Sequence, residues 1–121
     1  MKKMYCLSTC TTCQRIIKES GAEKNGFVFQ DIKNEKITPQ QLDAMKKMSG
    51  SYESLFSRRA LKYKEMGLKD VRLTENDFRR LILEEYTFLK RPVSILNGKL
   101  FAGSEKKTVE AFRQELKKKQ D

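Results

Sequence analysis

Two cysteines separated by two residues, Cys10 and Cys13, lie where a short apolar run gives way to a helical pattern. The run Met4–Leu7 has the length of a buried strand. Behind the cysteines, Ile16 and Ile17 are placed to face a core from one side of a helix. The sequence therefore predicts a strand, a turn that carries both cysteines, and then a helix.

Further strand and helix signals alternate along the rest of the chain. We expect a strand at Phe27–Ile32, then a helix opened by Thr38-Pro39 and two short helices within Ser51–Gly67. The next helix starts at Thr74, and the residues along one of its sides are Phe78, Leu81, Ile82, Glu85 and Leu89. A hairpin of Val93–Leu96 and Leu100–Ala102 follows around Asn97-Gly98, and a last helix is capped by Ser104, with Val109, Phe112 and Leu116 facing inward. We expect Arg91-Pro92 to break the helix that starts at Thr74.

This order predicts an α/β fold. A β-α-β unit is followed by a β-β-α unit, with a helical insertion at approximately residues 38–89 between the two halves. A thioredoxin/glutaredoxin-like core, with a mixed four-stranded sheet, has this order and carries a CxxC pair after its first strand. A chain of 121 residues is expected to form one such domain, and it can bury a core without disulfides or a structural metal.

The chain is strongly basic, with 26 Lys and Arg residues against 16 Asp and Glu residues and a formal net charge of +10. This excess favours anionic partners such as oxyanions, acidic protein surfaces or nucleic acid. A solvated basic face explains it equally well, and we prefer that interpretation for Lys117-Lys118-Lys119. No helix-turn-helix or basic patch with interleaved aromatic residues stands out, so direct nucleic-acid binding is not expected.

Two absences narrow the class of protein. No apolar run has the roughly 18 residues that span a bilayer, and no signal peptide follows Met1-Lys2-Lys3. Three cysteines are also too few for a secreted disulfide scaffold, so we expect a cytoplasmic protein without membrane contact. The chain has no histidine, which excludes Ser-His-Asp and Cys-His catalysis.

Cys10 and Cys13 are the candidate catalytic residues. A cysteine at a helix N-terminus meets unsatisfied N–H groups and the positive end of the helix dipole, and both stabilise the reactive thiolate. Thr11 and Thr12 add hydroxyl donors beside it. We therefore expect Cys10 to be the nucleophile and Cys13 to be the resolving thiol that attacks an adduct on Cys10.

Other interpretations of the cysteines stay open. A zinc site normally needs four ligands, and a chain with three cysteines and no histidine is not expected to hold a metal by itself, although two chains could share one. The pair could also be inert and buried. Cys6, on the same strand face as Met4, is interpreted as a small buried apolar residue.

An oxyanion substrate would need fixed positive charge near the nucleophile. Arginine suits this role because its planar guanidinium binds two oxygens at once. Arg58, Arg59 and Arg91 are the candidates. Arg91 stands out because Pro92 follows it, and in thioredoxin-like folds this proline is typically cis and lies against the CxxC pair.

The whole chain resembles the ArsC/Spx family, which comprises arsenate reductase-like and Spx-like proteins of the thioredoxin fold. The matching segments are Tyr5-Cys6-Leu7-Ser8-Thr9-Cys10-Thr11-Thr12-Cys13, Leu55-Phe56-Ser57-Arg58-Arg59, Tyr63-Lys64-Glu65-Met66-Gly67-Leu68, Arg91-Pro92-Val93-Ser94-Ile95 and Leu100-Phe101-Ala102-Gly103. Their order and spacing are far more specific than a CxxC pair alone.

The resemblance implies a site in which a thiolate meets an oxyanion held by two arginines. The family's N-T-R triplet falls on Ser57-Arg58-Arg59, which gives the anion-binding role to Arg59, and its R-P pair falls on Arg91-Pro92. Three positions depart from glutaredoxin-linked arsenate reductases, which have histidine, proline and a third arginine where this chain has Cys6, Ser8 and Ser104. Those enzymes generally lack the second cysteine, whereas Spx-like members have it.

Three functions follow as hypotheses. The first is a thiol oxidoreductase of the arsenate reductase class, without a bound cofactor and with glutathione, glutaredoxin or thioredoxin as external reductant. The second is an Spx-like regulator in which Cys10–Cys13 is a redox switch and the partner is the RNA polymerase α subunit. The third is a general thiol-disulfide or deglutathionylating protein. We favour the first.

Overall fold

The computed structural model describes residues 2–118, and the chain divides into two compact units. The first unit comprises Met1–Glu35 and Arg91–Asp121, and the second comprises Lys36–Lys90. The segment expected as a helical insertion, at approximately 38–89, falls within the second unit. Lys119, part of the basic tail considered above, lies outside the described residues.

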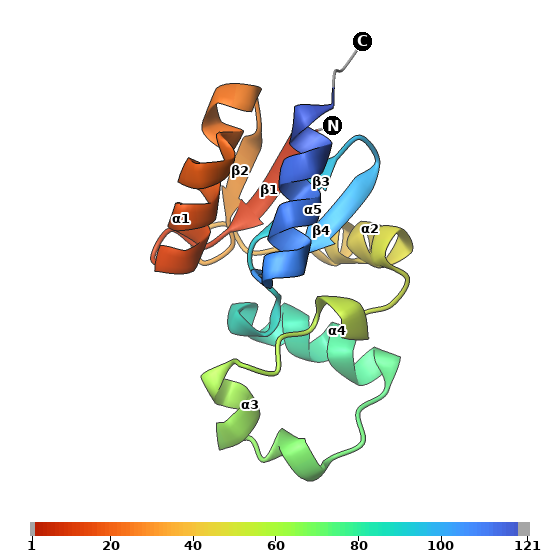
Figure 1. Cartoon of the computed structure of the whole chain (residues 1–121). Helices are drawn as coiled ribbons and strands as arrows, with labels where there is room; N and C mark the ends of the chain where they lie inside the picture. Colours follow the sequence, from red (N-terminus) through yellow and green to blue (C-terminus); the bar gives the residue numbers. More distant parts are fainter. Residues whose placement is uncertain (1, 119–121) are drawn as a thin grey trace. The chain divides into compact units, whose positions relative to one another are not determined.

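A mixed four-stranded sheet forms the centre of the first unit (Figure 1). Its strands are β1 (Lys2–Cys6), β2 (Val28–Asp31), β3 (Val93–Leu96) and β4 (Lys99–Ala102), in the spatial order β2-β1-β3-β4. β1 runs parallel to β2 and antiparallel to β3, and β3 is antiparallel to β4. The sheet is the one expected for a thioredoxin-like fold.

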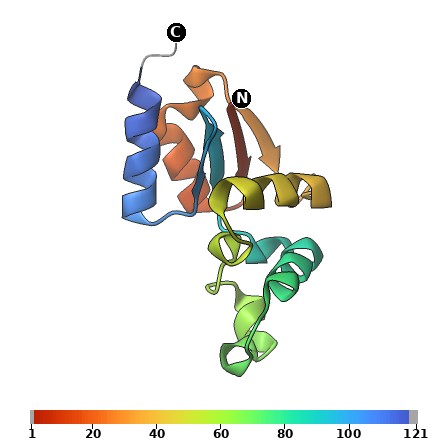
Figure 2. The ribbon, with the colours of Figure 1, turned by 90° about the vertical axis from the view of Figure 1, so that its right-hand side faces the viewer.

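Two long helices of this unit, α1 (Thr11–Ser20) and α5 (Lys106–Lys117), cover the same face of the sheet (Figure 2). α1 ends where Gly21 adopts a left-handed conformation with φ of 73°, and the short helix η1 (Ala22–Asn25) leads into β2. The Asn97-Gly98 turn joins β3 to β4 with φ of 53° and 74°, the left-handed geometry that tight hairpins require. The sequence signals for this hairpin are confirmed.

The core of the first unit is built between the sheet and these helices. Phe112 of α5 is 2% exposed, and its ring packs edge-on against Phe27 and at a tilt against Phe101, with both centroids 5.7 Å away. The sheet contributes Met4 and Cys6, both buried, to the same cluster. α1 and α5 are therefore fixed to the strand that leads into the cysteine pair.

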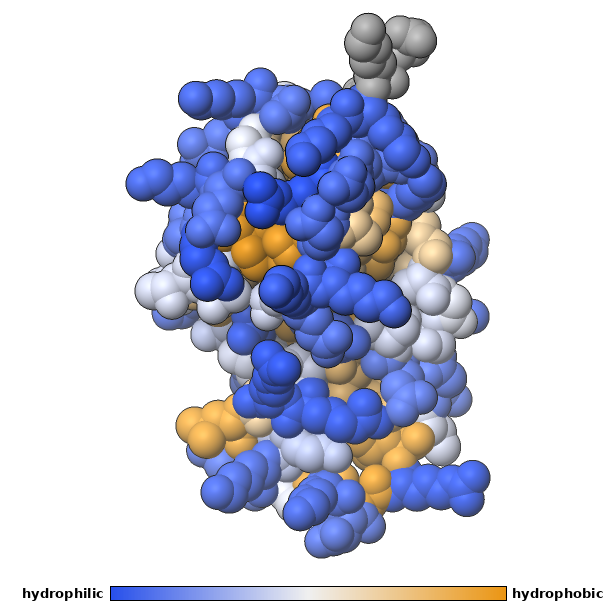
Figure 3. Space-filling model, viewed as in Figure 1, coloured by the Kyte–Doolittle hydropathy of each residue, from blue (hydrophilic) through white to orange (hydrophobic). Residues whose placement is uncertain are grey.

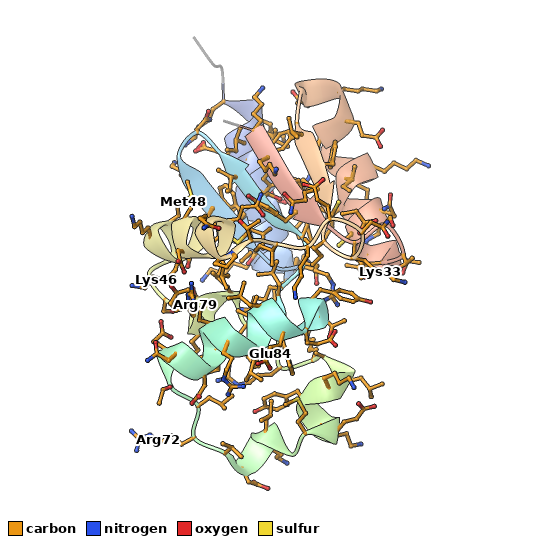
Figure 4. All side chains as sticks on the ribbon, turned by 180° about the vertical axis from the view of Figure 1, so that it is seen from behind. Lys33, Lys46, Met48, Arg72, Arg79 and Glu84 are labelled. Carbon is orange, nitrogen blue, oxygen red and sulfur yellow. The ribbon has the colours of Figure 1, made fainter. Side chains whose placement is uncertain are left out.

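The second unit consists of helices. They are α2 (Pro39–Ser49), η2 (Glu53–Leu55), α3 (Leu61–Glu65), η3 (Leu68–Asp70), α4 (Glu75–Glu84) and η4 (Tyr86–Phe88). Thr38 and Thr74 open α2 and α4 with complete capping boxes, as the sequence predicts. Arg79 of α4 donates to both carboxylate oxygens of Asp43 on α2, at 2.8 and 3.2 Å, and Figure 4 labels Arg79 together with Lys46 in this region.

Two details of the expected elements are wrong. α4 ends at Glu84 rather than continuing to Arg91-Pro92, because Glu85 turns to an extended conformation and its carboxylate accepts from the N–H and hydroxyl of Thr87 to start η4. Ser104 does not cap the last helix: α5 begins after Glu105, and no side chain caps it.

The visible surface is mainly hydrophilic, with apolar residues scattered between charged ones (Figure 3). Within residues 2–118, no helix combines the length and apolar character needed to cross a membrane.

Candidate active site

Cys10 lies at the junction of the loop after β1 and the first turn of α1. It is the N-cap residue, with φ of −90° and ψ of 111°, and its carbonyl accepts the first helical hydrogen bond from the Gln14 N–H at 3.1 Å. The first turn contains no acidic residue, so no side-chain carboxylate competes for its N–H groups. Cys10 is partly exposed, which leaves its thiol open to a reagent.

Cys13 follows within the first turn of the same helix but faces the core. It is fully buried and belongs to the apolar cluster that includes Met4, Ile17 and Phe112, and Cys10 packs against the edge of this cluster. Both cysteines are free thiols. The helix therefore presents one thiol to the surface and holds the second behind it.

The two environments shift the thiol pKa values in opposite directions. Partial burial raises the pKa of Cys10, but the N–H groups of Cys13 and Thr12, the Cys13 thiol and the Arg91 charge stabilise its thiolate, and the net pKa lies below the usual value. Burial dominates for Cys13 and raises its pKa to about 12, with the nearby Cys10 adding to the rise. At any given pH the thiolate form is therefore more populated at Cys10 than at Cys13.

Arg91 and Pro92 stand immediately before β3. The peptide bond between them is cis, as the resemblance implied for this proline, and Pro92 is buried while Arg91 is partly buried. The Arg91 charge acts on both Cys10 and Cys13. Three of the expected features, namely the thiol pair, the arginine and the cis proline, are therefore brought together in the first unit.

The remaining predicted site residues are Thr11, Thr12 and Arg59. Thr11 is exposed and Thr12 is partly exposed, and it is the backbone N–H of Thr12 that stabilises the Cys10 thiolate. Arg59 belongs to the second unit, where it is exposed. Its neighbour Arg58 is occupied in that unit by an ion pair with Glu53 at 2.8 Å and by the Phe56 and Phe78 rings.

Cys6 is buried on β1, and its thiol donates to the Gln30 carbonyl over 3.7 Å. Burial, followed by the negative charge of Asp31, raises its pKa. An unreactive Cys6 thiol agrees with its interpretation as a small apolar residue. Among residues 2–118, no group of three or more His, Cys, Asp or Glu side chains is arranged to hold a metal ion.

Two polar residues at the loop that leads into Cys10, Ser8 and Asp31, were not among the predicted site residues. The strand register places Asp31 beside Cys6, and the Ser8 hydroxyl donates to the Asp31 carboxylate. A signal was available: β1 and β2 are expected to be parallel, and residues that follow the carboxyl ends of neighbouring parallel strands meet at one edge of the sheet.

A comparison of the whole sequence with known protein families identifies the family. The model of the ArsC family matches residues 5–112. The chain belongs to the ArsC family. The match includes the CxxC pair, Arg59 and the Arg91-Pro92 unit. No curated protein matches the chain by sequence.

Solved structures show the same fold as this ArsC-family chain. An arsenate reductase (ArsC) related protein from Brucella melitensis is 26% identical, with a TM-score of 0.70, and the alignment covers 92% of each chain. An arsenate reductase from Vibrio cholerae is 14% identical, with a TM-score of 0.75, and the alignment covers 94% of this chain and 96% of the other. The membership of the arsenate reductase-like family and the thioredoxin-like fold expected from the sequence are thus confirmed.

Proposed function

We propose that this ArsC-family protein is a thiol-dependent oxidoreductase in which Cys10 attacks an oxyanion or a disulfide and Cys13 resolves the adduct. The observation that carries the proposal is that one helical turn leaves Cys10 partly exposed and buries Cys13 completely, and the two thiol pKa values shift in opposite directions. A nucleophile should be ionised and accessible at neutral pH, whereas a resolving thiol should stay unreactive until an adduct forms beside it.

With a disulfide substrate, the Cys10 thiolate attacks one sulfur and forms a mixed disulfide, and the other half leaves as a thiolate. Cys13 then loses its proton and attacks the Cys10 sulfur, the second half leaves as a thiolate, and a Cys10–Cys13 bond remains. The two electrons gained by the substrate come from the two cysteines. An external thiol, either glutathione, glutaredoxin or thioredoxin, supplies two electrons to restore them.

With arsenate, the Cys10 thiolate displaces a hydroxyl group, which leaves as water after protonation, and a sulfur–arsenic(V) bond forms. Attack of a second thiol on the Cys10 sulfur leaves the bonding electron pair on arsenic, which departs as arsenite. Arg91, whose charge reaches the thiol pair, would hold the anion, and the family resemblance adds Arg59. Thr11 and Thr12, in the first turn of α1, would donate hydrogen bonds from their hydroxyl groups to the anion.

The direct test is turnover of arsenate with a panel of reductants, namely glutathione, glutaredoxin with glutathione, and thioredoxin. We expect thiol oxidation that depends on arsenate with at least one donor and is lost in Cys10→Ser. A parallel panel with small disulfides covers the thiol-disulfide alternative within the same mechanism. Absence of turnover with every donor and every substrate would reject the enzyme.

An Spx-like regulator is the second candidate. Two observations favour it: Cys13 completes a CxxC pair, and Ser104 stands where the arsenate reductases have a third arginine. In this case oxidation of the pair to a disulfide would be the signal and the RNA polymerase α subunit would be the partner. Co-purification with that subunit under oxidising conditions, weakened by reduction, would support the regulator, and absence of binding in both states would count against it.

A further inference from the structure

Ser8 is an exposed loop residue that is nevertheless held from two sides. Its hydroxyl donates to Oδ2 of Asp31 at 2.5 Å, and its carbonyl accepts from the side-chain amide of Gln14 at 3.2 Å. Asp31 lies at the end of β2, and Gln14 lies in α1. Ser8 therefore links the sheet to the helix across the loop that leads into Cys10.

The Asp31 carboxylate is itself anchored. The parallel register places Asp31 beside Cys6, and the Ile32 N–H donates to the Cys6 carbonyl at 3.0 Å. In the following turn, the N–H of Lys33 donates to Oδ1 at 3.1 Å and the amide of Asn34 donates to Oδ2 at 3.0 Å. Figure 4 labels Lys33 at this turn. A side chain fixed in this way can orient a group that binds to it.

The group that it orients is the turn before α1. The Cys10 N–H donates to the Leu7 carbonyl at 3.0 Å, so Ser8 sits inside the turn that ends at Cys10. The N–H groups of Cys13 and Thr12 stabilise the Cys10 thiolate, and this turn sets where the thiol stands relative to them. By the resemblance, glutaredoxin-linked arsenate reductases have at the position of Ser8 a proline, whose ring restrains the backbone. Serine lacks the ring, and the hydrogen bond from its hydroxyl to Asp31 supplies a restraint instead.

We propose that Asp31, acting through Ser8, is a positioning residue for the Cys10 nucleophile. The inference rests on the proposed function, because it assigns Asp31 a part in setting the reactivity of that thiol. Asp31 does not touch the reacting atoms. When the Ser8 link is lost, the turn loosens and the Cys10 thiol spends less time against the N–H groups that stabilise its thiolate.

The test compares Ser8→Ala with Ser20→Ala, a matched loss of a hydroxyl at the opposite end of α1, where Ser20 donates to the Ile17 carbonyl. The measurement is the rate of Cys10 alkylation by iodoacetamide against pH, followed by peptide mass spectrometry. We expect Ser8→Ala to raise the pH midpoint and to slow the reaction at pH 7 about fivefold, the factor expected for one lost hydrogen bond. Ser20→Ala should leave both unchanged, and Ser8→Thr, which keeps the hydroxyl, should restore them.

A double-mutant cycle that combines Ser8→Ala with Asp31→Ala tests whether Asp31 acts through Ser8. If Asp31 acts through Ser8, the effect of Ser8→Ala should disappear in the Asp31→Ala background. An undiminished effect there would overturn the role of Asp31. An unchanged midpoint in Ser8→Ala, with a low midpoint in the wild type, would overturn the positioning role and leave the proposed function standing. An ordinary thiol midpoint in the wild type would overturn the proposed function, and the positioning role with it.

Discussion

Cys10 and Cys13 lie within one turn at the start of α1, and their different burial gives the two thiols different reactivity. Cys10 is partly exposed with a lowered pKa, whereas Cys13 is fully buried with a pKa raised to about 12. The helix N-terminus stabilises the Cys10 thiolate, and the apolar cluster around Cys13 disfavours the charged form of its thiol. One structural element therefore creates both an activated and a protected thiol.

The first prediction concerns the order in which the thiols react. Below the ordinary thiol pKa, Cys10 should be alkylated first, because its folded-state pKa is lowered and its thiolate is present at lower pH. Cys6 and Cys13 have raised pKa values and should react only at higher pH or after unfolding. Peptide mass spectrometry after timed alkylation from pH 5 to 9 measures this order, and Cys6 labelled before Cys10 would contradict it.

A second prediction concerns Arg91. Its charge lowers the pKa of Cys10, so Arg91→Ala should raise the pH midpoint of Cys10 alkylation. The rate at pH 7 should fall about fivefold, the factor that a charge interaction of about 1 kcal/mol supplies. Arg91→Lys should keep part of the effect, and added salt should weaken it in the wild type. Arg113→Ala, an exposed charge on α5, is the matched control, and an equal effect there would point to net charge rather than to Arg91.

Phe112 gives a prediction on stability. Its ring is 2% exposed and packs against both Phe27 and Phe101. Phe112→Ala should lower the free energy of unfolding by about 3–5 kcal/mol, since it removes a large buried side chain and leaves a cavity. Phe29 is 37% exposed, so Phe29→Ala should cost clearly less. Urea denaturation of both variants measures the two free energies of unfolding. Equal losses would argue against the packing of Phe112 of α5 against Phe27 and Phe101.

Glu115 gives a prediction on pH. It is buried on α5 and pairs with Lys99 at 2.7 Å and with Lys118 at 3.2 Å, which together hold its pKa below the usual value. A lowered folded-state pKa means that the stabilisation is present above the ordinary carboxyl pKa and is lost as the pH falls through the folded-state value.

Glu115→Gln should therefore be less stable than the wild type at pH 7, and the difference should narrow below about pH 4. Urea denaturation at both pH values measures it. Glu110→Gln, on an exposed position of the same helix, is the control. A difference that grows on acidification would show that the ion pairs are not the cause.

Much of this fold could be predicted from local signals. The CxxC turn, the two threonine caps and the Asn97-Gly98 hairpin each depend on short-range chemistry that is visible in the sequence. Where prediction failed, a competing local cap was the cause: α4 ends at Glu84, seven residues before Arg91, because Glu85 caps a new turn. Helix boundaries depend on such competing caps more than on apolar spacing.

The candidate site was predictable to a similar degree. Cys10, Cys13 and Arg91 could be identified because each belongs to a spaced motif. Ser8 and Asp31 belong to no spaced motif: 23 positions separate them, and it is the parallel register of β1 with β2, a weaker signal than a motif, that brings them together. Long-range polar pairs of this kind leave no periodic pattern in one sequence.

The most direct test of the thiol mechanism uses the disulfide reagent 5,5′-dithiobis(2-nitrobenzoic acid) at pH 7 on folded protein. Wild type should release two thionitrobenzoate anions per chain and end with a Cys10–Cys13 disulfide, identified by peptide mass spectrometry. Cys13→Ser should release one and retain the adduct on Cys10, and Cys10→Ser should react slowly. A stable adduct on wild-type Cys10, or a disulfide that contains Cys6, would contradict the roles assigned to the two cysteines.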